Sequence, residues 1–230
     1  MPVDITFSED FANAGIRPWL GIIEALVHVA PSDDDLKEAL AKTCKESLAR
    51  IGGTPVAAEP AIIRTRKAYR ALGKDPARYR PAAEALLRRL VKDQGVFPIN
   101  NVVDINNLIS ISTALSIGAF DSEFISPPVI LREGGEGETY HGIGRGVMNI
   151  ADLPVLADED GPFGSPTSDS ERTRVMSQTR RLLMVLYDFG DAPGLAETME
   201  MTAELLVRHA KATNLETRIL TGQVVSGCKL

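Results

Sequence analysis

The sequence predicts an α+β protein with a β-sandwich core flanked by helices. Helical patterns dominate before Asp121, strand patterns dominate after it, and short strand patterns lie near both ends of the chain. Strands and helices do not alternate in the βαβ order that builds a parallel sheet covered on both faces. We find no internal repeat and no linker long enough to separate two domains, so one domain covering residues 1–230 is expected.

Two strands and four helices are expected in the first half. An alternating pattern at residues 3–7 and an apolar run at residues 20–29 predict the strands. Ser32 precedes three aspartates, which suits a helix cap and a first turn, because the helix dipole favours acidic groups there. Gly73 ends a later helix and Pro81 opens the next one. The expected helices cover residues 33–51, 61–72, 81–92 and 102–116.

The second half is expected to be mainly β-structure. Glycine-rich residues 134–146 are typical of hairpin turns, and residues 161–170 combine glycine, proline, serine and threonine as loops do. One amphipathic helix is expected at residues 192–213. The expected strands cover residues 124–131, 153–157, 181–189 and 216–221.

Composition limits the class of protein. Of the 230 residues, 44% are hydrophobic and 24% are charged, as in ordinary globular proteins. The first ten residues lack the basic and apolar segments of a signal peptide, and no apolar run is long enough to span a bilayer. Cys44 and Cys228 fit no metal or disulfide spacing, which suits free thiols. We therefore expect a cytoplasmic protein without a membrane partner.

Positive charge is concentrated in one segment of an acidic chain. The net charge is −6, yet residues 61–92 hold ten basic and two acidic side chains, a local charge of +8 that leaves −14 elsewhere. The net charge argues against a dedicated nucleic-acid binder, and no DNA partner is expected. Two interpretations of the segment stay open: a surface for a polyanion such as RNA, or helices with solvated basic faces. The candidate RNA-binding residues are Arg66, Arg70, Lys74, Arg80 and Arg88.

Motifs of metal and cofactor enzymes are absent from the sequence. GIGRGV at residues 142–147 lacks the strand and helix that flank a dinucleotide-binding loop, so a turn is expected there. The acidic residues 158–160 lack the further ligands of a calcium loop, and no histidine lies near a cysteine or a paired acid. No GxSxG motif marks a serine nucleophile. We expect no metal and no cofactor, and no catalytic residue can be named.

Four asparagines between residues 100 and 107 interrupt an otherwise apolar stretch. An asparagine amide competes with the backbone for hydrogen bonds, so it is a poor residue inside a helix. Before a helix it is a good capping residue. Asn100, Asn101 and Asp104 are therefore expected to cap a helix and to satisfy its backbone.

The same stretch resembles a known family. VVDINN at residues 102–107, followed one helix length later by AFD at residues 119–121, resembles the B3/B4 module of the phenylalanyl-tRNA synthetase β chain. ADEDGP at residues 157–162 and SE at residues 170–171 are similar to two further motifs of that family. Residues 66–90 resemble its stand-alone relatives. The resemblance implies a B3/B4-type sandwich whose best-matching core is residues 60–190, with residues 1–55 as an N-terminal strand and helix extension.

The resemblance also implies a ligand pocket. In the synthetase this module edits tRNA that carries a wrong amino acid, chiefly tyrosine. By resemblance, Asn106, Asn107 and Gly118 form one wall of such a pocket and Glu171 the other, with free N–H groups supplied by the loop at residues 161–171. The synthetase has threonine, proline and histidine where this chain has Asn106, Ser116 and Gly118, and its loop is longer. Tyrosine specificity is therefore not expected, and glycine at position 118 predicts a wider cavity.

Three functions are compatible with these features. The first is binding of tRNA or aminoacyl-tRNA with hydrolysis of mischarged aminoacyl-tRNA in trans, which would make the protein a deacylase and not a tRNA ligase. Such an ester is labile enough that a positioned water and oxyanion donors suffice. The second is a non-catalytic module for RNA, a free amino acid or a similar small molecule. The third is a domain that only contacts other proteins. A steep weakening of RNA binding with rising salt would separate the first two functions from this one.

Overall fold

The computed structural model describes residues 2–222, and Cys228 lies outside this range. Its α-helices are α1 (Asp10–Asn13), α2 (Asp34–Ile51), α3 (Pro60–Ala71), α4 (Ala82–Val91), α5 (Asn101–Thr113) and α6 (Leu195–Ala210). Its strands are β1 (Ile5–Phe7), β2 (Trp19–Leu26), β3 (Ser116–Asp121), β4 (Val129–Glu133), β5 (Thr139–Gly142), β6 (Gly146–Asn149), β7 (Pro154–Asp158), β8 (Gly161–Gly164), β9 (Arg181–Asp188) and β10 (Thr213–Thr221).

The strands form two four-stranded sheets and one hairpin. The central sheet has the order β10-β2-β9-β3 and is antiparallel throughout. The small sheet has the order β1-β4-β7-β8, in which β1 pairs parallel to β4. Strands β5 and β6 form the separate hairpin. The fold is α+β, with a β-sandwich core flanked by helices, as the sequence predicts.

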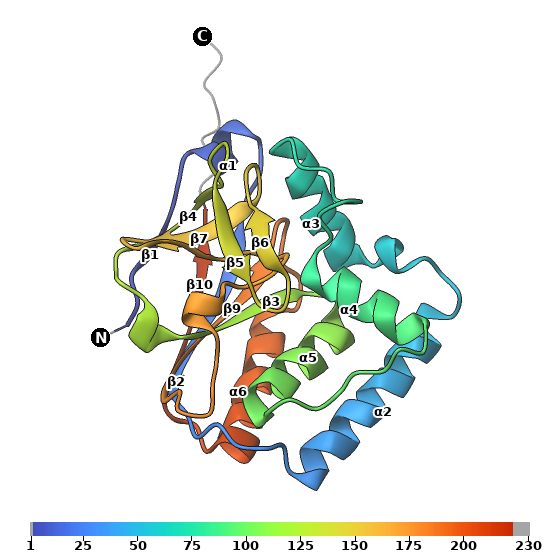
Figure 1. Ribbon diagram of the computed structural model, residues 1–230. Helices are drawn as coiled ribbons and strands as arrows, with labels where there is room; N and C mark the ends of the chain where they lie inside the picture. Colours follow the sequence, from blue (N-terminus) through green and yellow to red (C-terminus); the bar gives the residue numbers. More distant parts are fainter. Residues whose placement is uncertain (1, 223–230) are drawn as a thin grey trace.

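Strands β3 and β9 of the central sheet are buried on both faces. Along β9, Leu183 and Val185 belong to the core shared with the small sheet, while Leu182 and Met184 belong to the core shared with the helices. This follows from the two-residue period of a strand, which sends neighbouring side chains to opposite faces. It also explains why residues 181–189 are apolar without alternation. Figure 1 shows α2, α4, α5 and α6 gathered on one side of the molecule, with β1, β4 and β7 on the other.

Helix α2 begins one residue later than the sequence suggests. Its cap is Asp33, whose carboxylate accepts a hydrogen bond from the N–H of Leu36 at 2.8 Å. The Ser32 hydroxyl instead donates to Asp104 at 2.5 Å and ties α2 to α5. The helix ends at Gly52, whose φ of 52° is the left-handed conformation that glycine adopts easily.

The expected helix at residues 102–116 is too long. Helix α5 ends at Thr113, and Ala114 has a left-handed φ of 60°. Residues 116–121 then form β3, which pairs with β9 along its length. An apolar run of this kind fits a buried strand as well as a helix, and only pairing with β9 decides between them. The expected loop at residues 161–170 likewise begins with a short strand, β8.

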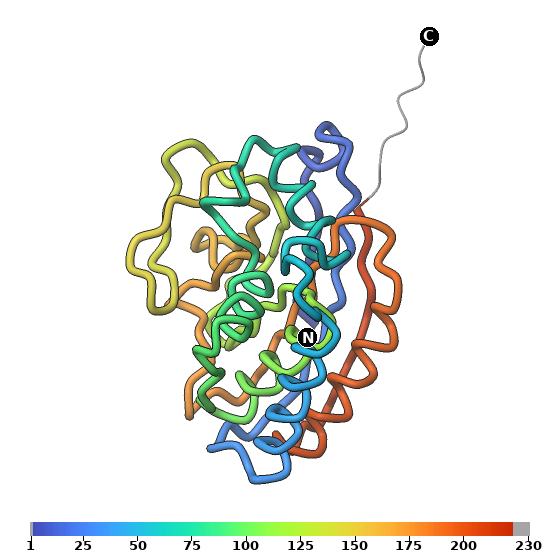
Figure 2. Tube along the Cα trace, turned by 90° about the vertical axis from the view of Figure 1, so that its right-hand side faces the viewer, coloured from blue at the N-terminus to red at the C-terminus, as the bar shows by residue number. Residues whose placement is uncertain are grey.

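The β5–β6 hairpin lies at the periphery of the fold. Figure 2 shows the β5–β6 hairpin, in yellow, on the side of the molecule opposite α6 and β10, in orange and red. No helix among residues 2–222 combines the length and the apolar content needed to cross a membrane.

Candidate functional site

The amino end of α5 uses its polar side chains for structure. Asn100 caps the helix by accepting a hydrogen bond from the N–H of Val103 at 2.9 Å. The Asn101 amide donates to two backbone oxygens on neighbouring segments. Asp104 accepts from the N–H of Ile99 at 3.0 Å. Asn100 therefore caps the helix as expected, while Asn101 and Asp104 satisfy backbone groups of neighbouring segments.

Asn106 and Asn107 lie one turn further along α5 and line a cavity of about 270 Å³. We call this cavity the asparagine pocket. Its walls come from α4, α5, β3, the tip of the β5–β6 hairpin and the turn that follows β8. The lining residues are Ala82, Ala85, Leu86 and Arg89 of α4, Asn106, Asn107 and Ser110 of α5, Ile117 of β3, Ile143 and Arg145 of the hairpin, and Thr167 and Ser168 of the turn.

The two asparagines differ in their hydrogen bonds. The Asn106 amide donates to the backbone oxygen of Ile117 at 3.3 Å, which links α5 to β3. The half-buried Asn107 side chain has no hydrogen-bond partner within residues 2–222. Its amide therefore offers two donors and one acceptor to whatever occupies the pocket.

Two arginines supply the charge of the pocket. Arg89 comes from α4 and Arg145 from the hairpin tip, and both side chains are exposed. Neither guanidinium lies within 4.0 Å of a carboxylate in the described part of the chain. No carboxylate, imidazole or thiol occurs among the described residues that line the pocket. The pocket is thus positively charged and lacks a side chain that serves as a general base at neutral pH.

Gly118 does not widen this pocket, contrary to the expectation. It is buried in β3 and does not belong to the lining. A Cβ atom at this position would lie 2.4 Å from the Cζ atom of Phe120 and 3.2 Å from the Asp169 carboxylate. Residues 118 and 120 share one face of the strand, so the Phe120 ring fills the space that a larger side chain at 118 would take.

Glu171 lies outside the lining as well. Its carboxylate accepts a hydrogen bond from the N–H of Gly144 at 3.3 Å and pairs with Arg174 at 2.6 Å. Its observed contacts therefore hold the hairpin tip that carries Arg145, and none reaches Asn106 or Asn107 across the cavity.

The turn after β8 uses the N–H groups that were expected to be free. The Ser165 hydroxyl oxygen accepts from the N–H of Thr167 at 3.3 Å and from the N–H of Ser168 at 3.2 Å. The Tyr140 hydroxyl lies 2.9 Å from the same oxygen. A short turn satisfies its own backbone in this way, because serine side chains mimic the turn hydrogen bond. The donors that remain in the pocket belong to side chains.

Asp169 is a half-buried residue directly after this turn, and its carboxyl group is enclosed. Its Oδ2 atom accepts from the N–H of Ala119 at 3.3 Å, while its enclosed Oδ1 atom has no hydrogen-bond partner within residues 2–222. Burial raises the pKa of this carboxyl to about 8. Asp169 is therefore mostly protonated and uncharged at neutral pH.

Two of the five candidate RNA-binding residues are held by one buried acid. The Glu84 carboxylate is fully buried and accepts from the guanidinium of Arg66 at 2.8 Å and from that of Arg88 at 2.9 Å. This triad joins α3 to α4. The sequence period places Arg66 and Arg88 on helix faces, but it does not reveal that Glu84 lies between them.

A third candidate is buried. Lys74 is 6% exposed, donates to the backbone oxygen of Ala151 and lies 3.9 Å from the ring centroid of Tyr79. Burial lowers its pKa. Arg70 and Arg80 are exposed and have no carboxylate partner within residues 2–222. The expected single positive surface is therefore wrong for Lys74, and only Arg70 and Arg80 of the five are both exposed and unpaired.

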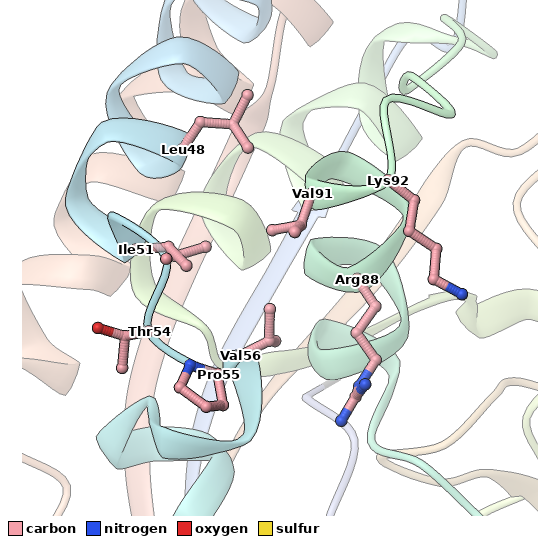
Figure 3. Close-up of a pocket in the computed structure, with 9 residues that line it drawn as sticks. Leu48, Ile51, Thr54, Pro55, Val56, Arg88, Val91 and Lys92 are labelled. Atoms are coloured by element: carbon pink, nitrogen blue, oxygen red, sulfur yellow. The ribbon is translucent and has the colours of Figure 1, made fainter.

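A second cavity, of about 310 Å³, lies between the end of α2 and α4 (Figure 3). Its walls are mainly apolar, with Ile51 and Val56 at the base and Leu48 and Val91 toward solvent. Apart from the basic side chain of Lys92 and the already paired Arg88, it holds few polar groups. We therefore take the asparagine pocket as the candidate site.

Sequence reasoning located two lining residues, Asn106 and Asn107, and missed most of the others. Arg89 was counted in the basic segment, and Arg145 lies in the GIGRGV turn, but no local pattern places the two side chains at one cavity. Asp169 is adjacent in sequence to a matching motif, and its burial was not visible there.

Comparison with known proteins gives one family and one solved structure. No curated protein matches the chain. A crystal structure of an N-terminal fragment of the phenylalanyl-tRNA synthetase β-subunit from Pyrococcus horikoshii is similar, with 14% sequence identity and a TM-score of 0.46. The match covers 95% of this chain and 50% of the other, so this chain spans about half the length of that fragment. The B3/4 domain model matches residues 64–216, well over half of the sequence, and the chain therefore belongs to the B3/4 domain family.

Proposed function

We propose that this B3/4 domain protein binds tRNA or aminoacyl-tRNA, with the 3′-terminal group in the asparagine pocket. The observation that carries the proposal is Asn107, a half-buried amide that lines the pocket without a protein partner in the described residues. Polar groups in folded proteins are rarely left unpaired, so water or a ligand is expected on this amide. Asn106 and Asn107, two of the four residues that the family resemblance assigns to a ligand site, line this pocket.

The basic segment at residues 61–92 leaves exposed arginines that suit a nucleic acid backbone. Arg70 of α3 and Arg80, which lies between α3 and α4, are exposed and unpaired within residues 2–222, and the same segment supplies Arg89 to the pocket. Arginine binds phosphate through its planar fork of donors, and several such contacts make affinity depend steeply on salt.

A filter-binding titration of tRNA against salt tests this proposal. We expect binding at low salt that weakens steeply as salt rises, and weaker binding by the Arg70→Glu/Arg80→Glu variant. Asn107→Ala should weaken binding by about 1–3 kcal/mol if the amide meets a buried polar group of the RNA. Asn13→Ala, which changes an exposed amide of α1, is the matched control. The proposal fails if tRNA does not bind at low salt. It also fails if the affinity for tRNA changes neither with salt nor with the substitutions at Arg70, Arg80 and Asn107.

Hydrolysis of mischarged aminoacyl-tRNA is the second candidate function. The Asn107 amide and the guanidinium groups of Arg89 and Arg145 are donors of the type that stabilises an oxyanion. Since the turn N–H groups are already bonded, these side chains carry that role. A screen with a panel of mischarged tRNAs tests it: we expect faster release of one amino acid, lost in Asn107→Ala. Release at the uncatalysed rate for every tRNA would leave a binding module without esterase activity.

A further inference from the structure

We propose that the asparagine pocket is selective for an oxyanion, a carboxylate or a phosphate group, held between Arg89 and Arg145. The inference rests on the proposed function in placing the ligand in the same pocket. It goes further because it assigns the ligand's charge and the residues that select it.

The pairing of the arginines is the first argument. Several arginines that border packed elements meet carboxylates: Arg64 meets Asp188 at 2.5 Å, and Arg172 meets Asp158 at 2.8 Å. Arg89 and Arg145 come from different elements, border one cavity and lack such a partner within residues 2–222. Two positive charges brought together repel each other, and a bound anion relieves that repulsion.

The residues around the pocket supply no free negative charge that would neutralise Arg89 and Arg145 in place of a bound anion. The nearby Glu171 is paired with Arg174. Asp169, behind the turn, is mostly uncharged at neutral pH, and burial raises the pKa of Tyr140 well above its usual range. An anion entering the pocket therefore meets positive charge without a competing carboxylate.

The remaining lining defines the rest of the ligand. The unpaired Asn107 amide supplies neutral donors beside the two guanidinium groups. Leu86, Ile117 and Ile143 supply apolar walls. A pocket of this size and lining fits a small group that combines one oxyanion with a short apolar part. It disfavours an ammonium group, which would face two like charges.

The positive charge of the pocket limits which aminoacyl groups can bind there. A free α-amino group is positively charged, so an ester of a neutral amino acid would bring the wrong charge into the pocket. An acidic side chain, or the phosphate group of a terminal nucleotide, would bring negative charge. The oxyanion can therefore come from a carboxylate or from a phosphate. Two pairs of small-molecule probes distinguish these two sources.

The experiment is calorimetric titration of the full chain with each pair. The α-amides of N-acetylaspartate and N-acetylasparagine differ only in the side-chain carboxylate, while AMP and adenosine differ only in the phosphate. We expect at least one anion to bind at least tenfold more tightly than its neutral partner. The pair that shows the difference identifies the source of the oxyanion.

Variants locate the binding. Arg89→Gln and Arg145→Gln should each weaken binding of that anion at least fivefold, while melting temperatures stay unchanged because both side chains are exposed. Arg208→Gln, on the exposed surface of α6, is the control and should bind as the original chain does. Equal affinity for anion and neutral partner, no binding of either anion, or an equal loss in the control overturns the proposal.

Filter binding of tRNA on the same preparations separates this inference from the proposed function. If tRNA binds and neither anion does, oxyanion selectivity fails and the proposed function stands. If an anion binds through Arg89 and Arg145 and tRNA does not, the proposed function fails and the selectivity stands.

Discussion

The Asp169 carboxyl group is enclosed, and no cation pairs with it within residues 2–222. An aspartate in an unfolded chain has a pKa near 3.9, and burial raises that of Asp169 to about 8 in the fold. Between these values the folded chain keeps a proton that the unfolded chain releases. Stability therefore falls as pH rises from about 4 to about 8, and the penalty is fully present above the folded-state pKa.

Asp169→Asn should remove this penalty, because an amide cannot ionise. We expect the variant to be more stable than the original chain by on the order of 3 kcal/mol at pH 8, with a smaller difference at pH 5. Urea unfolding at several pH values measures both. As a control, Asp188→Asn should lose stability at each pH, because it leaves the guanidinium of Arg64 unpaired. A loss of stability at pH 8 in Asp169→Asn would show that the carboxylate is charged and partnered.

Gly118 is required by the aromatic ring beside it. A Cβ atom at this position would lie 2.4 Å from Phe120, so Gly118→Ala should destabilise the fold by about 1–3 kcal/mol through overpacking. Chemical denaturation of Gly118→Ala, Phe120→Leu and the double variant measures the coupling. We expect the double variant to be less destabilised than the sum of the two, because each change relieves the other. Gly135→Ala, with only an ordinary contact near its Cβ position, should change little.

At the scale of elements, α3 and α4 are joined through the charge of Glu84. Its fully buried carboxylate forms ion pairs with Arg66 and Arg88, and these pairs offset the cost of burying its charge between the two helices. Removing one partner of a buried ion pair leaves the other charge without compensation. The basic segment of the sequence is therefore partly an internal support for the helices that carry the pocket.

Glu84→Gln should destabilise the protein by about 3 kcal/mol, as loss of a buried pair does. Thermal unfolding followed by circular dichroism measures it. Glu46→Gln is the matched control, since Glu46 pairs with Lys42 on the exposed face of α2, where such pairs contribute about 0–1 kcal/mol. Equal melting temperatures for the two variants would show that the triad adds nothing to the joining of α3 and α4.

At the scale of the whole molecule, both halves of the sequence share each sheet. Strand β2 lies between β9 and β10, and β1 adds to the small sheet beside β4. The N-terminal segment thus supplies an inner strand of the central sheet, although the family match begins only at residue 64. We propose that the chain is one domain that includes this segment.

A protease site inserted in the exposed turn at residues 135–137 tests the one-domain proposal. After cleavage we expect the two fragments to elute together in gel filtration, because β2 and β9, and likewise β4 and β7, would lie on different fragments and still pair. Unfolding of the cleaved protein should remain one transition. Two fragments that separate and each keep secondary structure would contradict the proposal.

Local patterns predicted much of the secondary structure. The caps at Asn100 and Gly52, the opening of α4 after Pro81 and the apolar run of β9 depend on the backbone preferences and burial of neighbouring residues. The pattern failed at β3, where residues 116–121 suit a helix or a strand and pairing with β9 decides. The sequence pattern also predicted Ser32 as the cap of α2, whereas the cap is the adjacent Asp33.

The sequence by itself determined the α+β class, most of the helices and strands, and the presence of Asn106 and Asn107 at a cavity. These follow from residue types within one or two helical turns, or from motifs that the family shares. Only the tertiary structure decided that the Asp169 carboxylate meets the N–H of Ala119, and that Arg89 and Arg145 border one pocket. The physical reason is that such contacts join residues far apart in the chain, and packing between elements sets them where local preference does not.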